Sequence, residues 1–453
     1  MSTNAEAMAT QHSSTTTNHP SRSAELFERA KKVMPGGVSR NTVLRAPYPP
    51  YVAYGHGCHV TDIDGVTRID FSGNMASLIH GNAYPPIVEA VKAQMERGSA
   101  FMMATEAEVL HAEHMCSRSA GFERIRFVNS GTEAVMAALK TARAFTGRPK
   151  IAKAEGAYHG GYDYAEASQA PTPATWGSVD HPNTVALTHG SPQSALQDVV
   201  ILPFNDVDRS IAILDAHKHD LACVLLDLMP HRVGMNPAAP AFVQAVREWT
   251  AANGSLFVAD EVITYRTEVG GLQSRYGVLA DLTCMGKVIG GGFPVGALAG
   301  RADVMDVMNP GAAKVLYPLS GTFSANPITM TAGRIAMEHF DAKAVAKVNA
   351  LGDRARAGIE AAIARTGVSA SVAGGGSMFR VHMKASVPQN YREAFATPAE
   401  AKALKTLLDH LFEEGFLLIG TGTCMINTAM GNDEIDSLVA SIEAGFKRVV
   451  AAG

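Results

Sequence analysis

A lysine and an aspartate follow two apolar runs of the kind that form buried strands. Lys287 comes after the run 282–285 and opens into a glycine-rich stretch, and Asp260 ends the run 256–259. Because the carboxyl ends of parallel strands gather at one edge of a sheet, we expect both side chains to face a ligand there. A lysine in that position can condense with the aldehyde of a cofactor. A buried carboxylate needs a partner, and a protonated ring nitrogen of the cofactor would supply one.

Both residues also have ordinary explanations. A lysine after a strand can simply be solvated, and Asp260 can cap the helix that follows its strand. A nucleotide-binding P-loop is excluded, because that motif needs a glycine five residues before the Gly-Lys pair and a Ser or Thr after it. Asp281 and Val288 stand at these two positions.

Three further segments could hold the phosphate and the ring of such a cofactor. Ser130, Gly131 and Thr132 open an alanine-rich helix, where free backbone N–H groups favour an anion. Tyr158 follows a short apolar run and offers an aromatic face for a flat ring. Thr322 lies in a polar loop whose hydroxyl and backbone groups can donate to a phosphate. A plain helix cap, an unrelated aromatic residue and an ordinary turn would use the same residue types.

The elements that must position these residues change in character along the chain. Apolar residues at helical spacing over 23–34 predict a first helix. Alternation of apolar and polar residues within 51–71, around Asp64-Gly65, predicts a hairpin. From residue 76 onward, helix-sized segments alternate with short apolar runs. The runs are 125–128, 151–152, 222–226, 256–259, 282–285 and 297–299. This alternation predicts an α/β fold with a mostly parallel sheet flanked by helices.

We expect four parts in sequence order. They are a flexible tail at 1–20, a helix and hairpin at 21–75 that belong to a small domain, a large domain at 76–331 and the rest of the small α+β domain at 332–453. A chain of 453 residues is too long for one ordinary domain, which supports this division.

Charge and cysteine usage narrow the class of partner. The 39 Lys and Arg residues against 43 Asp and Glu residues give a formal charge of -4, which offers no basic field to nucleic acid or to an anionic membrane. No apolar run approaches the roughly 20 residues of a membrane span.

The five cysteines lack CxxC spacing, so we predict a reducing, cytoplasmic location. His111 and His114 lack the spacing of a zinc HExxH motif, so we interpret them as part of a solvated helix and predict no metal site.

Taken in order, six stretches resemble the class III aminotransferases of fold type I, which depend on pyridoxal 5'-phosphate. Within this family the chain resembles most the branch that holds glutamate-1-semialdehyde aminomutase and the β-amino-acid transaminases. The stretches are MPGGVSR at 34–40, FVNSGTEA at 127–134, EGAYHG at 155–160, DEV at 260–262, GKVIGGGFPVG at 286–296 and SGTF at 320–323. They span nearly everything after residue 20.

The resemblance implies a role for each residue. Lys287 would hold the cofactor and then carry the proton between substrate and cofactor, while Asp260 would pair with the pyridine nitrogen. Tyr158 and Val262 would press on opposite faces of the ring. The phosphate would be held by Ser130, Gly131 and Thr132, together with Thr322 from the partner subunit of a homodimer.

Departures from the family pattern bear on the substrate. Asp227 stands where the family usually has a glutamate followed by proline, and the late loop 420–424 reads GTGTC where β-amino-acid transaminases tend to have a carboxylate-binding arginine. Two arginines could replace it as a bidentate clamp. Arg40 is the first candidate and Arg232 the second, although Arg232 could equally lie in a surface loop.

The sequence therefore predicts a transaminase that moves an amino group from a small-molecule donor, of β-amino or other non-α type, to a keto-acid acceptor. The alternative within the family is an aminomutase that shifts the amino group within one molecule. A non-catalytic binding protein would have no need for both Lys287 and Asp260.

Overall fold

The computed structural model describes residues 21–452 and divides them between two compact units. The smaller unit comprises the described residues up to Tyr54 together with Thr61–Thr67, and the larger comprises Gly55–Val60 and the chain from Arg68 onward. The expected tail at 1–20 lies outside the described residues. The domain boundaries expected from the sequence stay a prediction.

The smaller unit begins with a helix that is shorter than predicted. Helix α1 (Arg22–Ala30) starts after Ser21, whose hydroxyl accepts a hydrogen bond from the Ala24 N–H at 3.3 Å. The prediction of a helix to residue 34 was wrong, because Lys32 and Val33 donate to carbonyls three rather than four residues back and the chain turns at Gly36, with φ of 64°. The predicted Asp64-Gly65 turn is confirmed: Asp62 Oδ1 accepts from the N–H groups of Asp64 and Val66.

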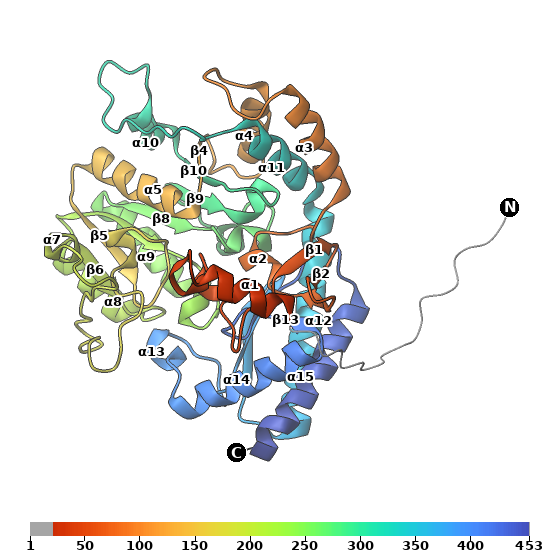
Figure 1. Cartoon of the computed structure of the whole chain (residues 1–453). Coiled ribbons are helices and arrows are strands. Elements are labelled where there is room, and N and C mark those ends of the chain that lie inside the picture. The colour runs from red at the N-terminus through yellow and green to blue at the C-terminus, as the bar shows by residue number, and fades with distance from the viewer. Residues whose placement is uncertain (1–20, 453) are drawn as a thin grey trace. The chain divides into compact units, whose positions relative to one another are not determined.

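The larger unit contains a seven-stranded sheet in the order β4-β10-β9-β8-β7-β5-β6 (Figure 1). Strand β10 runs antiparallel to both its neighbours, and the other neighbouring pairs are parallel. The strands are β4 (Arg124–Val128), β5 (Lys150–Ala154), β6 (Val199–Leu202), β7 (Leu221–Leu226), β8 (Leu256–Asp260), β9 (Leu282–Gly286) and β10 (Gly296–Gly300). The predicted α/β fold with a mostly parallel sheet is confirmed, and β6 adds a strand to the predicted set.

Alternate residues of this sheet enter two separate cores, as expected when both faces are covered. In β8, Leu256 and Val258 pack with Leu139 of α5 on one face. Phe257 packs with Phe242 of α9 on the other face. The side chains of β8 are therefore buried along its whole length, and only its carboxyl end can present a group to a ligand.

The remaining strands form smaller assemblies. Strands β11 (Ser371–Gly375), β12 (Met378–His382) and β14 (Thr423–Met425) form a sheet in that order. Strand β13 (Phe416–Leu417) pairs with Ile69 and Asp70 of β3 (Thr67–Asp70). The first two strands of the chain are β1 (Val52–His56) and β2 (His59–Asp62).

The helices after α1 lie before, between and after these strands. They are α2 (Gly73–Ala76), α3 (Pro85–Arg97), α4 (Glu106–Ser117), α5 (Gly131–Thr146), α6 (Asp163–Glu166), α7 (Gln193–Gln197), α8 (Val207–Ala216), α9 (Pro240–Asn253), α10 (Ala302–Met305), α11 (Pro327–His339), α12 (Ala342–Thr366), α13 (Tyr391–Ala394), α14 (Pro398–Glu413) and α15 (Asn432–Ala452). Within residues 21–452, none of them has the length and apolar character needed to cross a membrane.

Candidate active site

Asp260 ends β8 with both carboxylate oxygens engaged. Oδ2 lies 2.7 Å from Nδ1 of His159, and Oδ1 accepts from the Val262 N–H at 3.0 Å. Because a carboxylate only accepts, Nδ1 of His159 carries the proton. Burial lowers the pKa of His159, against the opposing effect of Asp260, so the ring acts as a neutral donor that orients the acid. The sequence analysis did not single out His159, although it stands directly after Tyr158.

Lys287 lies on the strand next to Asp260. Strand β9 pairs with β8 so that Asp260 faces Cys284, and Lys287 is the first residue beyond β9. Its backbone φ is 50°, a left-handed conformation that non-glycine residues rarely adopt and that clusters at functional sites. Burial lowers the pKa of the Lys287 amine, and the charges of Asp260 and Asp227 oppose that shift. The structure therefore brings the lysine and both acids to one edge of the sheet.

Asp227 follows β7 and is the second acid of this edge. It is buried, and Oδ1 accepts from the Met229 N–H at 2.9 Å. Burial and the nearby charge of Asp260 raise the pKa of Asp227 well above its usual range. Asp227 therefore holds a proton more readily than an exposed aspartate.

The start of α5 packs against the segments that carry Val262 and Tyr158. Ser130 Oγ accepts from the Glu133 N–H at 3.1 Å, so this hydroxyl caps its own helix. A Cβ on Gly131 would come within 2.8 Å of Val262 Cγ1, which explains the need for glycine at this close approach. Thr132 Oγ1 accepts from the Gly161 N–H at 3.4 Å. The three predicted phosphate-binding residues thus share one edge with Val262.

Tyr158 and Arg232 lie near each other through His231. The rings of Tyr158 and His231 are 5.9 Å apart and inclined at 70°, and the Tyr158 side chain is exposed. Arg232 Nε donates to the carbonyl of Gln169 at 3.3 Å. Arg232 is therefore partly buried beside the candidate site rather than in a surface loop.

The other two predicted contacts lie elsewhere in the chain. Thr322 is exposed in the loop before α11, as a residue offered to a partner subunit would be, but its role stays a prediction. Arg40 belongs to the smaller unit, and its role as a substrate residue also stays a prediction.

Lys153 is a buried lysine that sequence reasoning missed. Its side chain is fully buried in β5, and Nζ donates to the carbonyls of Ala157 at 3.0 Å and Ala167 at 2.7 Å. Burial, and then the charge of Arg232, lower the pKa of Lys153 to about 7. Lys153 thus anchors the segment that carries Tyr158 and His159. The available signal was a lysine inside an otherwise apolar strand.

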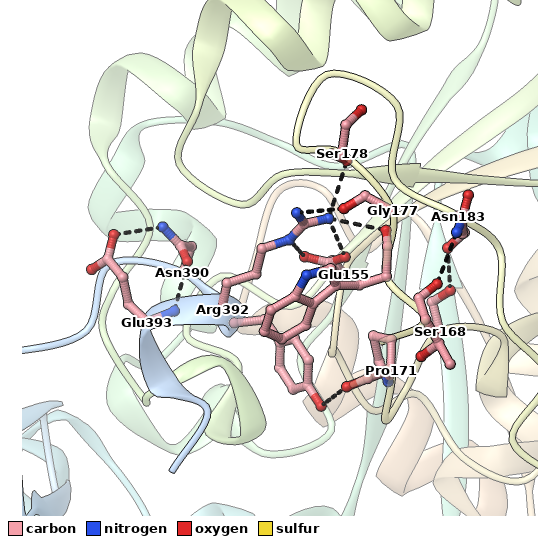
Figure 2. A network of polar contacts seen from close by, with 12 residues as sticks. Glu155, Ser168, Pro171, Gly177, Ser178, Asn183, Asn390, Arg392 and Glu393 are labelled. Atoms are coloured by element: carbon pink, nitrogen blue, oxygen red, sulfur yellow. Dashed lines mark hydrogen bonds and ion pairs between the residues drawn. The ribbon is translucent and has the colours of Figure 1, made fainter. Parts of the chain in front are cut away.

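Arg392 holds the same segment from α13. Figure 2 shows its guanidinium against Glu155, with Nε–Oε2 and Nη2–Oε1 distances of 2.8 and 2.9 Å. The same guanidinium donates to the carbonyls of Gly177 and Ser178. The bidentate pair joins α13 to the end of β5, and the two carbonyl bonds join α13 to the loop around residue 177.

The interpretation of residues 111–116 as part of a solvated helix was wrong for His111. Its ring is buried, stacks on Phe127 at 5.1 Å, and Nε2 lies 3.0 Å from the carbonyl oxygen of Ile289. The reason is that α4 turns this side chain toward the core. Over residues 21–452, no group of three or more potential metal-binding side chains is found.

Comparisons with known proteins find matches over most of the chain. Residues 45–444 match the family model described as aminotransferase class-III. The glutamate-1-semialdehyde 2,1-aminomutase of Methanothermobacter thermautotrophicus is 35% identical over 430 residues, which cover 93% of this chain and 98% of that protein.

Two solved structures extend the comparison. An omega-transaminase from Sphaerobacter thermophilus superposes with a TM-score of 0.93 at 43% identity, covering 95% of this chain and 98% of that one. A β-phenylalanine aminotransferase from Variovorax paradoxus superposes with a TM-score of 0.83 at 32% identity, covering 93% of each chain. The fold is therefore that of fold type I enzymes. The chain belongs to the class III aminotransferases, the pyridoxal-phosphate-dependent enzymes that transfer amino groups.

Proposed function

We propose that this protein transfers an amino group from a β-amino acid, or another non-α amino compound, to a keto acid. The observation that carries the proposal is that Lys287 and Asp260 lie at the carboxyl ends of the neighbouring strands β9 and β8. The names of two structural relatives, an omega-transaminase and a β-phenylalanine aminotransferase, favour a non-α donor.

The residues at this edge fit pyridoxal 5'-phosphate. His159 Nε2 is a buried polar atom without a hydrogen-bond partner among the described residues, and Nδ1 of the same ring fixes the carboxylate of Asp260. We propose that Asp260 pairs with the pyridine nitrogen, and that Tyr158 and Val262 contact the ring. The phosphate would be held by Ser130, Gly131 and Thr132. When bound, the cofactor supplies an electron sink for the substrate carbon.

Lys287 is the proposed catalytic base. Burial lowers the pKa of its amine, which favours the neutral form that can take up a proton at Nζ. Asp260 and Asp227 limit this shift, so Lys287 can also return the proton. His159 and Lys153 do not move protons in this scheme; they position Asp260 and the Tyr158 segment.

A homodimer is part of the proposal, with Thr322 completing the phosphate site of the partner subunit. Thr322 lies among exposed residues that include the apolar side chain of Phe323, and Phe101, Met102 and Met103 are also exposed. Exposed apolar side chains of this size favour a protein interface. A cytoplasmic location is proposed from the five cysteines, which are all free thiols.

The aminomutase alternative rests on the 35% identical relative that bears this name. A donor and acceptor panel on the purified holoenzyme separates the two. A transaminase forms product from 3-aminobutanoate only when a keto acid such as 2-oxoglutarate is added. An aminomutase converts glutamate 1-semialdehyde to its isomer without any second substrate. Isomer formation without an acceptor, and no transfer from 3-aminobutanoate, would contradict the proposal.

A further inference from the structure

Arg232 and Arg380 are neighbouring cations that lack a carboxylate partner among residues 21–452. Arg380 lies on β12, is partly buried, and uses two of its five N–H donors in the hydrogen bonds of the structure. Burial, and then the charge of Arg232, lower the pKa of Arg380 to about 10. Two guanidinium groups that repel each other in this way are stabilised by an anion between or beside them.

The position of Arg380 ties this pair to the active site. Its Nη1 donates to the carbonyl of His231 at 2.7 Å, next to Arg232 in the chain. The His231 ring contacts that of Tyr158, and the charges of Lys287, Arg232 and Arg380 add to burial in lowering the pKa of His231 to about 3. Arg380 is hydrogen-bonded to His231 and Arg232 follows His231 in the chain, so both arginines lie near the residue whose ring contacts Tyr158.

Arg380 also reaches the late loop at 420–424. Its Nε donates to the carbonyl of Thr421 at 3.0 Å, and β12 places Arg380 opposite Thr423 of β14. This loop reads GTGTC and carries no arginine. Arg380 brings a guanidinium to the loop from the neighbouring strand instead.

We propose that Arg380, together with Arg232, binds the carboxylate group of the substrate. The planar donors of a guanidinium match a carboxylate in geometry and charge, which an ammonium matches less well. The inference rests on the proposed function and deepens it: the enzyme selects amino compounds that carry a carboxylate over plain amines. It makes Arg380 a specificity residue that the sequence analysis did not identify.

The test compares two donors that differ only in the carboxylate. They are 3-aminobutanoate and isopropylamine, which is the same molecule with a hydrogen in place of the carboxylate. For wild-type holoenzyme and the Arg380→Gln and Arg380→Lys variants, kcat/KM is measured for each donor, and binding of the unreactive butanoate is followed by calorimetry. We expect the Arg380→Gln variant to lose about 10- to 100-fold of the preference for 3-aminobutanoate and to bind butanoate more weakly by a similar factor. The Arg380→Lys variant should recover part of the preference for 3-aminobutanoate and part of the butanoate affinity.

A matched control is Arg356→Gln. Arg356 also donates to two carbonyls, those of Gly376 and Met378, but it has Asp353 as its acid partner. Its substitution should leave the preference between the donors as it is. The inference is overturned if Arg380→Gln binds butanoate like the wild type, or if it lowers kcat/KM for both donors by the same factor. Failure of the wild-type enzyme to transfer from either donor would instead contradict the proposed function, while butanoate binding would still test Arg380.

Discussion

Nδ1 of His159 lies 2.7 Å from Oδ2 of Asp260, in a place where both side chains are buried. The two residues are 101 positions apart in the chain. This bond fixes the direction of the acid proposed to face the cofactor ring.

Replacing His159 by Phe removes the donor and leaves Asp260 Oδ2 without this partner. A hydrogen bond to a charged group contributes about 1.5–3 kcal/mol, so the free energy of unfolding should fall by that order. Amino transfer should slow as well, because the carboxylate is no longer oriented. Denaturant unfolding and kcat/KM measure both effects. His219→Phe, at an exposed histidine, is the control, and a His159→Phe variant that matches it in both measurements would remove His159 from the site.

Replacing Lys287 by Ala removes the proposed base. Amino transfer should fall by about 100- to 10,000-fold, the range for loss of a general acid-base group. The visible absorbance of the holoenzyme should change as well, because the cofactor would lose its lysine partner. Lys92→Ala, at an exposed lysine, serves as the control. Normal turnover by Lys287→Ala would show that the mechanism is wrong.

The buried amine of Lys153 predicts a pH dependence of stability. Its pKa is about 7 in the folded protein against an ordinary value of 10.5, so between these values the unfolded chain binds more protons than the folded chain. The contribution of Lys153 to the free energy of unfolding therefore rises with pH across this window, by up to about 1.4 kcal/mol per pH unit. Denaturant unfolding at pH 7, 8 and 9 should show this rise in the wild type relative to Lys153→Met. Parallel pH profiles would contradict it.

The ion pair between Arg392 and Glu155 should be a strong stability determinant. Glu155 is 5% exposed and Arg392 20% exposed at their side chains, and loss of one partner from a buried pair costs about 3–5 kcal/mol. We expect a loss of that order for Arg392→Gln in thermal or denaturant unfolding. The pair of Arg354 with Asp436 is exposed, so Arg354→Gln should cause little change. Equal losses of unfolding free energy for the two substitutions would mean that burial of the Arg392–Glu155 pair adds nothing to stability.

Arg40→Ala tests the other candidate for the substrate carboxylate. If Arg40 contacts the substrate, the variant should show a higher KM for carboxylate donors while the amount of bound cofactor stays the same. The measurement is a KM series with 3-aminobutanoate together with the visible spectrum of the holoenzyme. Unchanged kinetics would remove Arg40 from the site.

Much of the large sheet, and the position of two candidate site residues at its edge, could be predicted from the sequence. Apolar runs of strand length are a local signal, and residues directly after such runs must lie at a sheet edge. Lys287 and Asp260 could therefore be placed without coordinates. The end of α1 could not be predicted, because the i→i+3 bonds of Lys32 and Val33 leave no clear mark in the helical spacing of the sequence.

The sequence by itself determined the family, the α/β architecture and the placement of a lysine and an acid at the ends of neighbouring strands. Only the tertiary structure decided what surrounds them: His159 against Asp260, Arg392 against Glu155 over 237 positions, and Arg380 beside His231. The physical reason is the distance along the chain over which each interaction acts. Burial and periodicity are written into neighbouring residues, whereas a hydrogen bond or an ion pair between distant segments depends on how the whole chain packs.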